Sequence, residues 1–442
     1  MKRALSDRAR VLTATAFRRL QTKAQVFSLE KNAAVRSRLT HTLEVALYGQ
    51  LIASRAADAL VKAGHLDRAH AQAFVTTVES ACLLHDVGNP PFGHLGEFAI
   101  QEWFTKRGPK LDRIWRSSGV DASVGDAIRN AYKEFDGNPQ GLRIVAKLQW
   151  LHDEFGLNLS AALLGAILKY PTGIRVEGQP FAGKIGFFPT ESDAVVFVSD
   201  RCGLVTGQRH PLAYLMESAD DIAYCLSDIE DALEKQIVAE DFFLSDGVPE
   251  AARKYLRGTA TENDCTNSRF IDFRIELTRA MVETAADLFV ERYEDILGNR
   301  LTQPLLSLDA PMASTLDGLK TFSRRHIFSS PEAVDVELSG YHVVQSLLTH
   351  LFPLLSISTS DFSALFKEAD RKPSRRLPLE TRLATLLPKK HRLAYRFASA
   401  AEPDLEPVFR TQLLVDYVAG MTDVHALQIF RTLTAGVDGI EL

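Results

Sequence analysis

The chain has 442 residues, of which 46% are hydrophobic and 24% are charged, close to the average composition of soluble globular proteins. Its 51 Lys and Arg residues and 56 Asp and Glu residues give a formal net charge of −5, which excludes a protein that binds nucleic acid through an overall basic surface. The four cysteines are scattered without a C-x-x-C pair, so we expect a cytoplasmic protein with neither a disulfide framework nor a thiolate zinc site. No apolar run reaches the length of a membrane helix, so no membrane partner is expected.

Apolar residues recur at three- and four-residue intervals along most of the chain, which predicts an all-α fold. In chain order, we expect helices at 41–62, 71–86, 141–154, 159–169, 212–238, 270–297, 340–356 and 408–431. The segment 170–191 is rich in Gly, Pro and aromatic residues, and we expect a loop there with a small hairpin. No repeat or linker divides the chain, which favours one large helical domain over two independent ones.

The strongest shift in composition is a basic run at 367–396, which contains ten Lys and Arg residues and three Asp and Glu residues. A solvated surface is the simpler interpretation of this run. A patch that binds an anionic partner is the alternative.

Histidines and carboxylates occur where a helical protein would otherwise place apolar residues. His85 and Asp86 end an apolar helix just before a Gly-Asn-Pro-Pro turn, and such groups are costly to bury unless they are paired or bound to metal. His41 begins another helix and Asp220 lies within a third. Two imidazoles and two carboxylates suit Mn²⁺, Mg²⁺, Fe²⁺ or Co²⁺. We predict that His41, His85, Asp86 and Asp220 form a metal site, with Asp221 as the competitor of Asp220.

Further chemistry is predicted around these ligands. His94 and Glu97 are three residues apart, and a helix that starts near Phe92 would project both side chains from one face. We predict that His94 is a general acid or base oriented by Glu97; a hydrogen bond that only braces the metal site is the alternative. Arg38, one turn before His41, is predicted to clamp phosphate, because guanidinium binds phosphate bidentately.

Six segments carry a resemblance to a known family: FRRLQTKAQVF (17–27), RSRLTHTLEV (36–45), LLHDVGNPPFGHLGE (83–97), LKYP (168–171), ADDIAYCLSDIEDAL (219–233) and DYVAGMTDVHAL (416–427). Together they resemble the bacterial deoxyguanosine triphosphate triphosphohydrolases (dGTPases) of the HD-domain phosphohydrolase superfamily. The resemblance implies an enzyme that uses Mn²⁺, Mg²⁺ or Co²⁺ to cleave dGTP, or another dNTP, into a deoxynucleoside and tripolyphosphate. It also implies an all-helical homo-oligomer, often a hexamer. We expect residues 1–35 to contribute to the active site of an HD core at 36–235, with a helical region at 236–442 packed on it.

The resemblance also assigns roles to residues that contact substrate. Gln25 is expected at the sugar 3′-OH, while Tyr224 and Asp228 lie at i+4 and i+8 from Asp220 and are expected at the deoxyribose. Core packing is the alternative for Tyr224. Candidates with less support are Asn89, Asn138, Lys169 and Tyr170 for the triphosphate and Tyr341 for the base.

Three functions compete at this point. The first is a dNTP triphosphohydrolase, with dGTP as the favoured substrate or with a broad range of dNTPs. The second keeps the metal site but hydrolyses phosphodiesters or nucleoside monophosphates. The third is a regulator without activity that binds nucleotides or single-stranded nucleic acid through the run 367–396; single-stranded DNA as an effector of the enzyme would combine the first and third. An ATPase of the P-loop class is excluded, because no GxxxxGK[ST] motif occurs.

Overall fold

A computed structural model describes residues 1–150, 153–178, 181, 183–256, 268–368 and 376–434. The all-α prediction is confirmed: these residues form no strand, and their one β-type pairing is an isolated bridge between Ala24 and Ser37. The α-helices of the described residues are α1 (Lys2–Thr13), α2 (Thr15–Arg19), α3 (Arg38–Lys62), α4 (Arg68–Leu84), α5 (Gly93–Ser117), α6 (Ala122–Lys133), α7 (Gly137–Arg143), α8 (Ala161–Ile167), α9 (Ser192–Cys202), α10 (Pro211–Glu234), α11 (Glu240–Phe242), α12 (Ser268–Glu291), α13 (Tyr293–Leu297), α14 (Ala310–His326), α15 (Pro331–Leu351), α16 (Thr359–Glu368), α17 (Pro378–Thr385), α18 (Lys389–Ala401), α19 (Glu406–Ala419) and α20 (Asp423–Thr434).

Shorter helical turns connect several of these helices. Two are π-type turns, Ile144–Leu148 and Phe243–Gly247. The 3₁₀ turns are Leu20–Thr22, Pro189–Glu191, Glu250–Tyr255, Leu305–Leu308, Phe352–Leu355 and Pro403–Leu405.

Local capping determines where the helices that carry the site begin. The Ser37 side chain accepts a hydrogen bond from the Thr40 backbone N–H, and the Thr40 hydroxyl accepts one from the Ser37 N–H. This capping box satisfies two backbone donors that the helix leaves unpaired, so α3 begins at Arg38, three residues before the expected start. Helix α10 begins at Pro211, where the fixed φ of proline suits the first helical position.

Several expected helix bounds are wrong. The helix expected at 408–431 is two helices, because α19 ends at Ala419 and α20 begins at Asp423. The helix expected at 141–154 begins earlier, at Gly137 after the Asp136 cap, and its helical backbone ends at Leu148. The helix expected at 340–356 begins at Pro331, because Ser330 caps it.

The remaining expected helices differ at their ends. The helix expected at 270–297 divides into α12 and α13. The helices expected at 71–86, 159–169 and 212–238 form as α4, α8 and α10, each with ends shifted by one to four residues. The described residues of 170–191 contain no strand, so no hairpin forms among them, and their only regular element is the 3₁₀ turn Pro189–Glu191.

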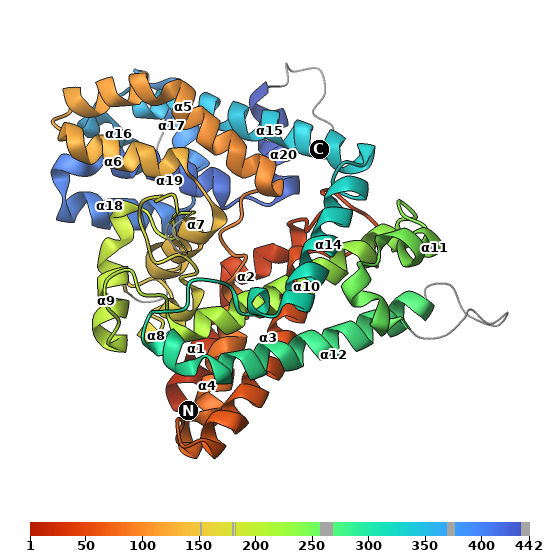
Figure 1. The fold of residues 1–442 in the computed structure, drawn as a ribbon. Helices are drawn as coiled ribbons and strands as arrows, with labels where there is room; N and C mark the ends of the chain where they lie inside the picture. Colours follow the sequence, from red (N-terminus) through yellow and green to blue (C-terminus); the bar gives the residue numbers. More distant parts are fainter. Residues whose placement is uncertain (151–152, 179–180, 182, 257–267, 369–375, 435–442) are drawn as a thin grey trace.

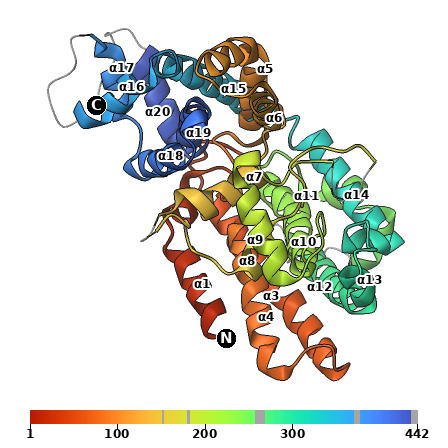
Figure 2. The same ribbon diagram turned by 90° about the vertical axis from the view of Figure 1, so that its left-hand side faces the viewer.

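Buried apolar side chains form two clusters, and the helices divide between them; Figure 1 shows the arrangement of these helices. The first cluster, which we call the first core, unites α1, α3, α4, α8 and α10 with α12 and α14. The second core unites α5 and α6 with α15–α20, so that α5 packs along α15 although more than 200 residues separate them. Figure 2 shows α5, α6 and α15–α20 on one side of the molecule and α1, α3 and α4 on the other. The turn at 85–93 therefore connects the two cores.

Among the described residues, no single helix is long and apolar enough to cross a membrane. One bent pair, Pro331–Leu355 with Thr359–Phe366, reaches the required length and composition together. Its apolar side chains, including Val344, Leu347 and Leu351, are buried in the second core.

Candidate metal centre and active site

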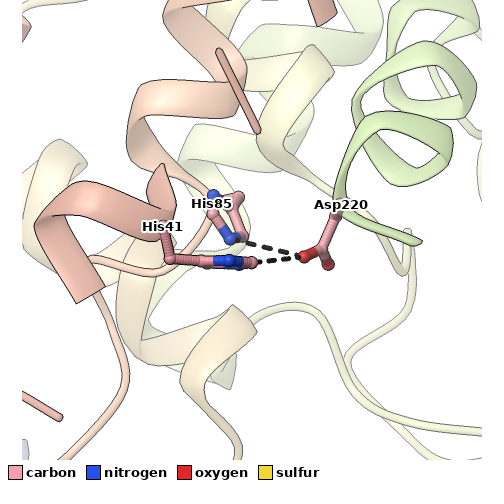
Figure 3. A group of neighbouring side chains, drawn as sticks. All are labelled: His41, His85 and Asp220. Atoms are coloured by element: carbon pink, nitrogen blue, oxygen red, sulfur yellow. Dashed lines mark ion pairs between the residues drawn. The ribbon is translucent and has the colours of Figure 1, made fainter. Parts of the chain in front are cut away.

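Three side chains from distant parts of the chain converge where α3, the end of α4 and α10 meet (Figure 3). His41 comes from the first turn of α3, His85 follows the last residue of α4, and Asp220 lies in the middle of α10. The Asp220 Oδ1 atom is 3.7 Å from His41 Nε2 and 3.5 Å from His85 Nε2, and one ligand atom from each residue lies within 4.8 Å of the others. Both histidines are buried, whereas the Asp220 side chain is 26% exposed, so the cluster opens towards solvent on the Asp220 side.

The hydrogen bonds of His85 prepare one of its nitrogens to bind a cation. His85 Nδ1 lies 2.7 Å from the Cys82 carbonyl oxygen, and this contact requires a proton on Nδ1, which leaves a lone pair on Nε2. His85 Nε2 is buried and has no hydrogen-bond partner. A buried nitrogen without a partner that faces a carboxylate is what a metal ligand needs, so these residues fit a divalent cation bound through nitrogen and oxygen.

Asp86 lies beside this cluster and is held by two of the predicted phosphate ligands. Its Oδ2 atom is 3.5 Å from His85 Nε2 and accepts a hydrogen bond from Arg38 Nη1 at 2.6 Å, while Asn89 Nδ2 donates to Oδ1. Burial opposes ionisation of Asp86, but Arg38 and the two histidines outweigh it and lower its pKa to about 2. Asp86 is therefore a carboxylate, and Arg38 neutralises it in this structure.

The register of α10 distinguishes Asp220 from its neighbour. Asp220 faces the histidines, whereas Asp221 Oδ1 accepts a hydrogen bond from Lys320 of α14 at 2.7 Å. Burial would raise the pKa of Asp220, but His85, His41 and Lys169 hold it below its usual range. The two adjacent aspartates therefore have separate partners.

Lys169 is fixed at the edge of the cluster by a chain of buried charges. Its Nζ lies 3.7 Å from Asp220 Oδ2 and 3.6 Å from Glu217 Oε1, and Arg209 Nη1 donates to Glu217 Oε2 at 2.7 Å. Arg209 is 1% exposed, and its guanidinium also lies 4.5 Å from the Tyr214 ring centroid. Burial opposes the charge on Lys169, but Glu217 and its neighbours raise its pKa above the usual range. Lys169 is therefore a fixed positive charge beside the predicted metal ligands.

His94 and Glu97 form the predicted pair on the first turn of α5, which begins at Gly93 as expected. His94 Nδ1 is 3.2 Å from Glu97 Oε2, and Glu97 Oε1 accepts a hydrogen bond from the Gly137 backbone N–H at 2.7 Å. Glu97 is buried, but the His94 side chain is 84% exposed. The hydrogen bond to Glu97 raises the pKa of His94 above its usual value, against the charges of Arg38 and Lys184. With Nδ1 bonded to Glu97, Nε2 is the nitrogen that can reach a substrate.

Close backbone packing fixes the turn between the metal cluster and His94. A Cβ atom on Gly88 would lie 2.0 Å from the Gly137 carbonyl oxygen, so only glycine fits at this position. Phe92 adopts φ = 63°, a left-handed conformation that is uncommon for residues other than glycine. The motif at 83–97 is thus explained by a tight turn that brings the end of α4 against the start of α7.

The residues predicted at the sugar contain buried polar atoms without partners. Gln25 Oε1 and both carboxylate oxygens of Asp228 are buried and unpaired. Burial, together with the charge of Asp231, raises the pKa of Asp228 well above its usual value, which favours the protonated form of this carboxyl group. Tyr224 is partly buried and its ring lies 6.1 Å from that of Phe328. A polar ligand with hydroxyl groups would satisfy these atoms.

The other substrate candidates have partners outside the metal cluster. Asn138 donates to Asp136 Oδ1, and Tyr170 has Lys169 Nζ 6.0 Å from its ring centroid. The Tyr341 hydroxyl donates to Glu102 on α5, and its ring lies 6.1 Å from that of Phe98. Tyr341 is therefore placed along α5, the helix that carries His94.

Sequence reasoning missed two lysines at this site. Lys23 is buried and donates to the carbonyl oxygens of Asn89 and Ala419, and burial lowers its pKa to about 7 although Asp423 raises it. Lys184 donates to Asp136 Oδ2 at 2.6 Å and lies close enough to His94 to lower its pKa. Lys23 occurs inside the quoted motif at 17–27 and could have been considered, whereas Lys184 lies in the loop 170–191 and has no local pattern around it.

The basic run 367–396 is described in part, because residues 369–375 lie outside the described residues. In the described part, Lys389, Lys390 and Arg396 are exposed on α18. Arg392 instead lies 5.4 Å from the ring centroid of Phe366.

Comparison with known proteins agrees with this geometry. Residues 38–152 match the model of the HD domain family, and they include His41, His85 and Asp86. A deoxyguanosinetriphosphate triphosphohydrolase of Serratia proteamaculans (strain 568) is 35% identical over an alignment of 480 residues, which covers 97% of this chain and 93% of the relative. Proteins of the same name from Enterobacter sp. (strain 638) and Yersinia pestis (strain Pestoides F) are also 35% identical, with the same coverage. With both histidines of the cluster inside the part that matches an HD domain and a similarity that extends over nearly its whole length, the chain belongs to the deoxyguanosinetriphosphate triphosphohydrolase family.

Proposed function

We propose that this protein is a metal-dependent dNTP triphosphohydrolase that converts dGTP and water into deoxyguanosine and tripolyphosphate. The observation that carries the proposal is the position of the His94–Glu97 pair, which follows the turn after His85, beside a cluster of two buried histidines and Asp220 that fits a divalent cation. The family relationship supports the choice of substrate.

His41, His85, Asp86 and Asp220 would hold the cation, and we propose Mn²⁺, Mg²⁺ or Co²⁺. A divalent ion there supplies positive charge that offsets the triphosphate and polarises the α-phosphorus. Lys169 adds a fixed positive charge beside the cation. Arg38, which is bonded to Asp86 in this structure, can also bind a phosphate oxygen, because its guanidinium has donors for both groups. A triphosphate would then be bound without a glycine-rich phosphate loop.

His94 would act as the general acid. Water adds to the α-phosphorus and releases a proton to solvent, the bond between that phosphorus and the 5′-oxygen breaks, and His94 Nε2 donates its proton to the leaving 5′-oxygen and then regains one from solvent. Glu97 accepts the hydrogen bond from Nδ1 throughout and stabilises the protonated imidazole before the transfer. The exposure of His94 is consistent with this role, because the ring must reach a substrate that arrives from solvent.

The deoxyribose would lie against Tyr224, with Asp228 and Gln25 at its 3′-hydroxyl. The carboxyl oxygens of Asp228 and Gln25 Oε1 are buried without partners, and a single hydroxyl group can donate a hydrogen bond to one of these residues and, where Asp228 carries a proton, accept one from Asp228. Tyr224 would occupy the space that a 2′-hydroxyl requires, which favours deoxynucleotides. Asn89, Asn138 and Tyr170 remain proposed triphosphate contacts, and Tyr341 remains a proposed base contact.

The assembly and effectors are also proposals. The family relationship supports a homo-oligomer, with a hexamer as the form to test by light scattering. The exposed lysines of α18 support single-stranded DNA as an effector; unchanged dGTP turnover and no retention on an oligonucleotide column would contradict this.

One assay tests the function. Purified protein is incubated with Mn²⁺, Mg²⁺ or Co²⁺ and each of the four dNTPs, with GTP as the matched ribonucleotide control, and products are resolved by ion exchange. Release of deoxyguanosine with intact tripolyphosphate supports the proposal, and little turnover of GTP supports the role of Tyr224. Release of orthophosphate, pyrophosphate or a nucleoside monophosphate contradicts it and favours a different HD-type hydrolase.

A further inference from the structure

The motif at 416–427 lies far along the chain from the predicted ligands, yet it contacts the turn between them and His94. Within it, α19 ends at Ala419 and α20 begins at Asp423. Asp423 is 2% exposed. Its Oδ1 atom accepts a hydrogen bond from the Phe92 backbone N–H at 3.1 Å, and its Oδ2 atom accepts one from the Ala24 N–H at 3.0 Å. One buried carboxylate therefore joins two segments that are 68 residues apart in the sequence.

Both segments lead directly to proposed active-site residues. Phe92 has left-handed backbone geometry and immediately precedes α5, on which His94 occupies the second position. Such a conformation persists only where the surroundings hold it. Ala24 precedes Gln25, whose buried side-chain oxygen Oε1 has no hydrogen-bond partner. The carboxylate of Asp423 thus holds the backbone beside a proposed catalytic residue and beside a proposed sugar contact.

A second connection joins the same places. Lys23 Nζ donates to the carbonyl oxygen of Ala419 at 3.1 Å and to that of Asn89, and the Lys23 carbonyl oxygen accepts from the Arg38 backbone N–H at 3.0 Å. The junction of α19 and α20 is therefore connected both to the turn after Asp86 and to the first residue of α3.

The surroundings of Asp423 account for its charge within the protein. Two backbone donors satisfy its two oxygens, and the buried ammonium of Lys23 supplies an opposite charge. Packing supports the same turn from α15, where a Cβ on Gly340 would lie 2.3 Å from Phe92 Cγ. Nothing in this arrangement requires Asp423 to touch substrate.

We propose that Asp423 is a positioning residue, which sets the place of His94 through Phe92 and the place of Gln25 through Ala24. This inference rests on the proposed function. Asp423 itself takes no part in the chemistry; it acts through two backbone amides.

The test compares Asp423→Asn and Asp423→Ala with the wild-type enzyme and with Glu406→Gln. Asn keeps one acceptor for the two N–H groups and Ala keeps none, so the loss should be smaller for Asn. Glu406 is a matched control, because it is a buried carboxylate of α19 that is bonded to Tyr395 and Arg410 in the second core.

We expect kcat for dGTP to fall by about tenfold to a hundredfold in the Asp423 variants, because a displacement of about 1 Å has effects of this size. KM for dGTP should rise through Gln25, while the Mn²⁺ dissociation constant should stay close to that of the wild type, because Asp423 is bonded to the amides of Phe92 and Ala24 and not to a predicted ligand. Glu406→Gln should lose thermal stability but keep kcat. Hydrogen exchange of the peptide 86–97 should become faster in the Asp423 variants and not in Glu406→Gln.

Two results would overturn the inference: wild-type kcat and KM in the folded Asp423 variants, or unchanged exchange at 86–97. A wild-type protein that hydrolyses no dNTP would instead refute the proposed function, and the exchange measurement would still decide whether Asp423 holds the turn.

Discussion

Replacement of His94 by alanine should slow the chemical step without loss of cation binding, because the His94 side chain is exposed and is not one of the predicted metal ligands. A single positioned acid or base contributes about 10²–10⁴-fold to a rate, so His94→Ala should raise the activation barrier by about 2.7–5.4 kcal/mol at 1.36 kcal/mol per tenfold. The side chain is 84% exposed, so the free energy of unfolding should change by no more than about 0.5 kcal/mol. The predicted ligands His41, His85 and Asp220 are untouched, and Mn²⁺ binding should persist.

The assay measures kcat from tripolyphosphate release, Mn²⁺ binding by calorimetry and stability by thermal unfolding. His70→Ala is the matched control, because His70 is an exposed histidine on α4 that has no proposed role and should keep wild-type kcat. A His94→Ala enzyme within about tenfold of the wild-type rate would refute the assignment of a general acid. Loss of Mn²⁺ in this variant would show instead that His94 braces the metal site.

Three further changes test other parts of the site. Glu97→Gln removes the carboxylate that raises the pKa of His94; because the acid must be protonated, the alkaline limb of the kcat–pH profile should move to lower pH, and an unmoved limb would contradict the pairing. Asp220→Ala removes a predicted ligand and should abolish both Mn²⁺ binding and turnover, so retained stoichiometric Mn²⁺ would exclude Asp220 as a ligand. Arg209→Met leaves Glu217 buried without its main partner and should cost about 3–5 kcal/mol of unfolding free energy in urea. Adding Glu217→Gln should recover part of that loss, and additive losses would disprove the coupling.

The fold could be predicted where local chemistry decides the structure. The Pro-Pro turn after Asp86 separates α4 from α5, so the start of α5 near Phe92 was predicted correctly. The break between α19 and α20 could not be predicted from periodicity, because apolar residues such as Val418 and Ala426 continue the helical pattern on both sides of it. Local residues mark that break instead: Gly420 caps the end of α19, and Thr422 Oγ1 accepts a hydrogen bond from the His425 backbone N–H at the start of α20.

The types of residue at the site could be predicted from the sequence, whereas the pairs of side chains that contact each other could be predicted less well. The register of α10 separates Asp220 from Asp221, and this follows from helix geometry alone. The pairing of Arg38 with Asp86 depends on contact across 48 residues, and no sequence pattern marks it. The contact of Lys184 with Asp136 is not marked by a sequence pattern either, because it joins a loop residue to the residue that caps a distant helix.

The division of apolar side chains into two clusters has a mechanical consequence. Of the predicted cation ligands, His41 and Asp220 lie on helices of the first cluster, and His85 and Asp86 directly follow one of its helices, whereas the proposed proton donor lies on a helix of the second. The distance between the cation and the proton donor therefore depends on how the two clusters pack against each other, and not on either cluster alone. A bound partner or a second subunit that moves one cluster against the other by about 1 Å would change turnover severely while leaving cation affinity constant. The ratio of turnover to cation affinity therefore reports on how the two clusters are positioned relative to each other.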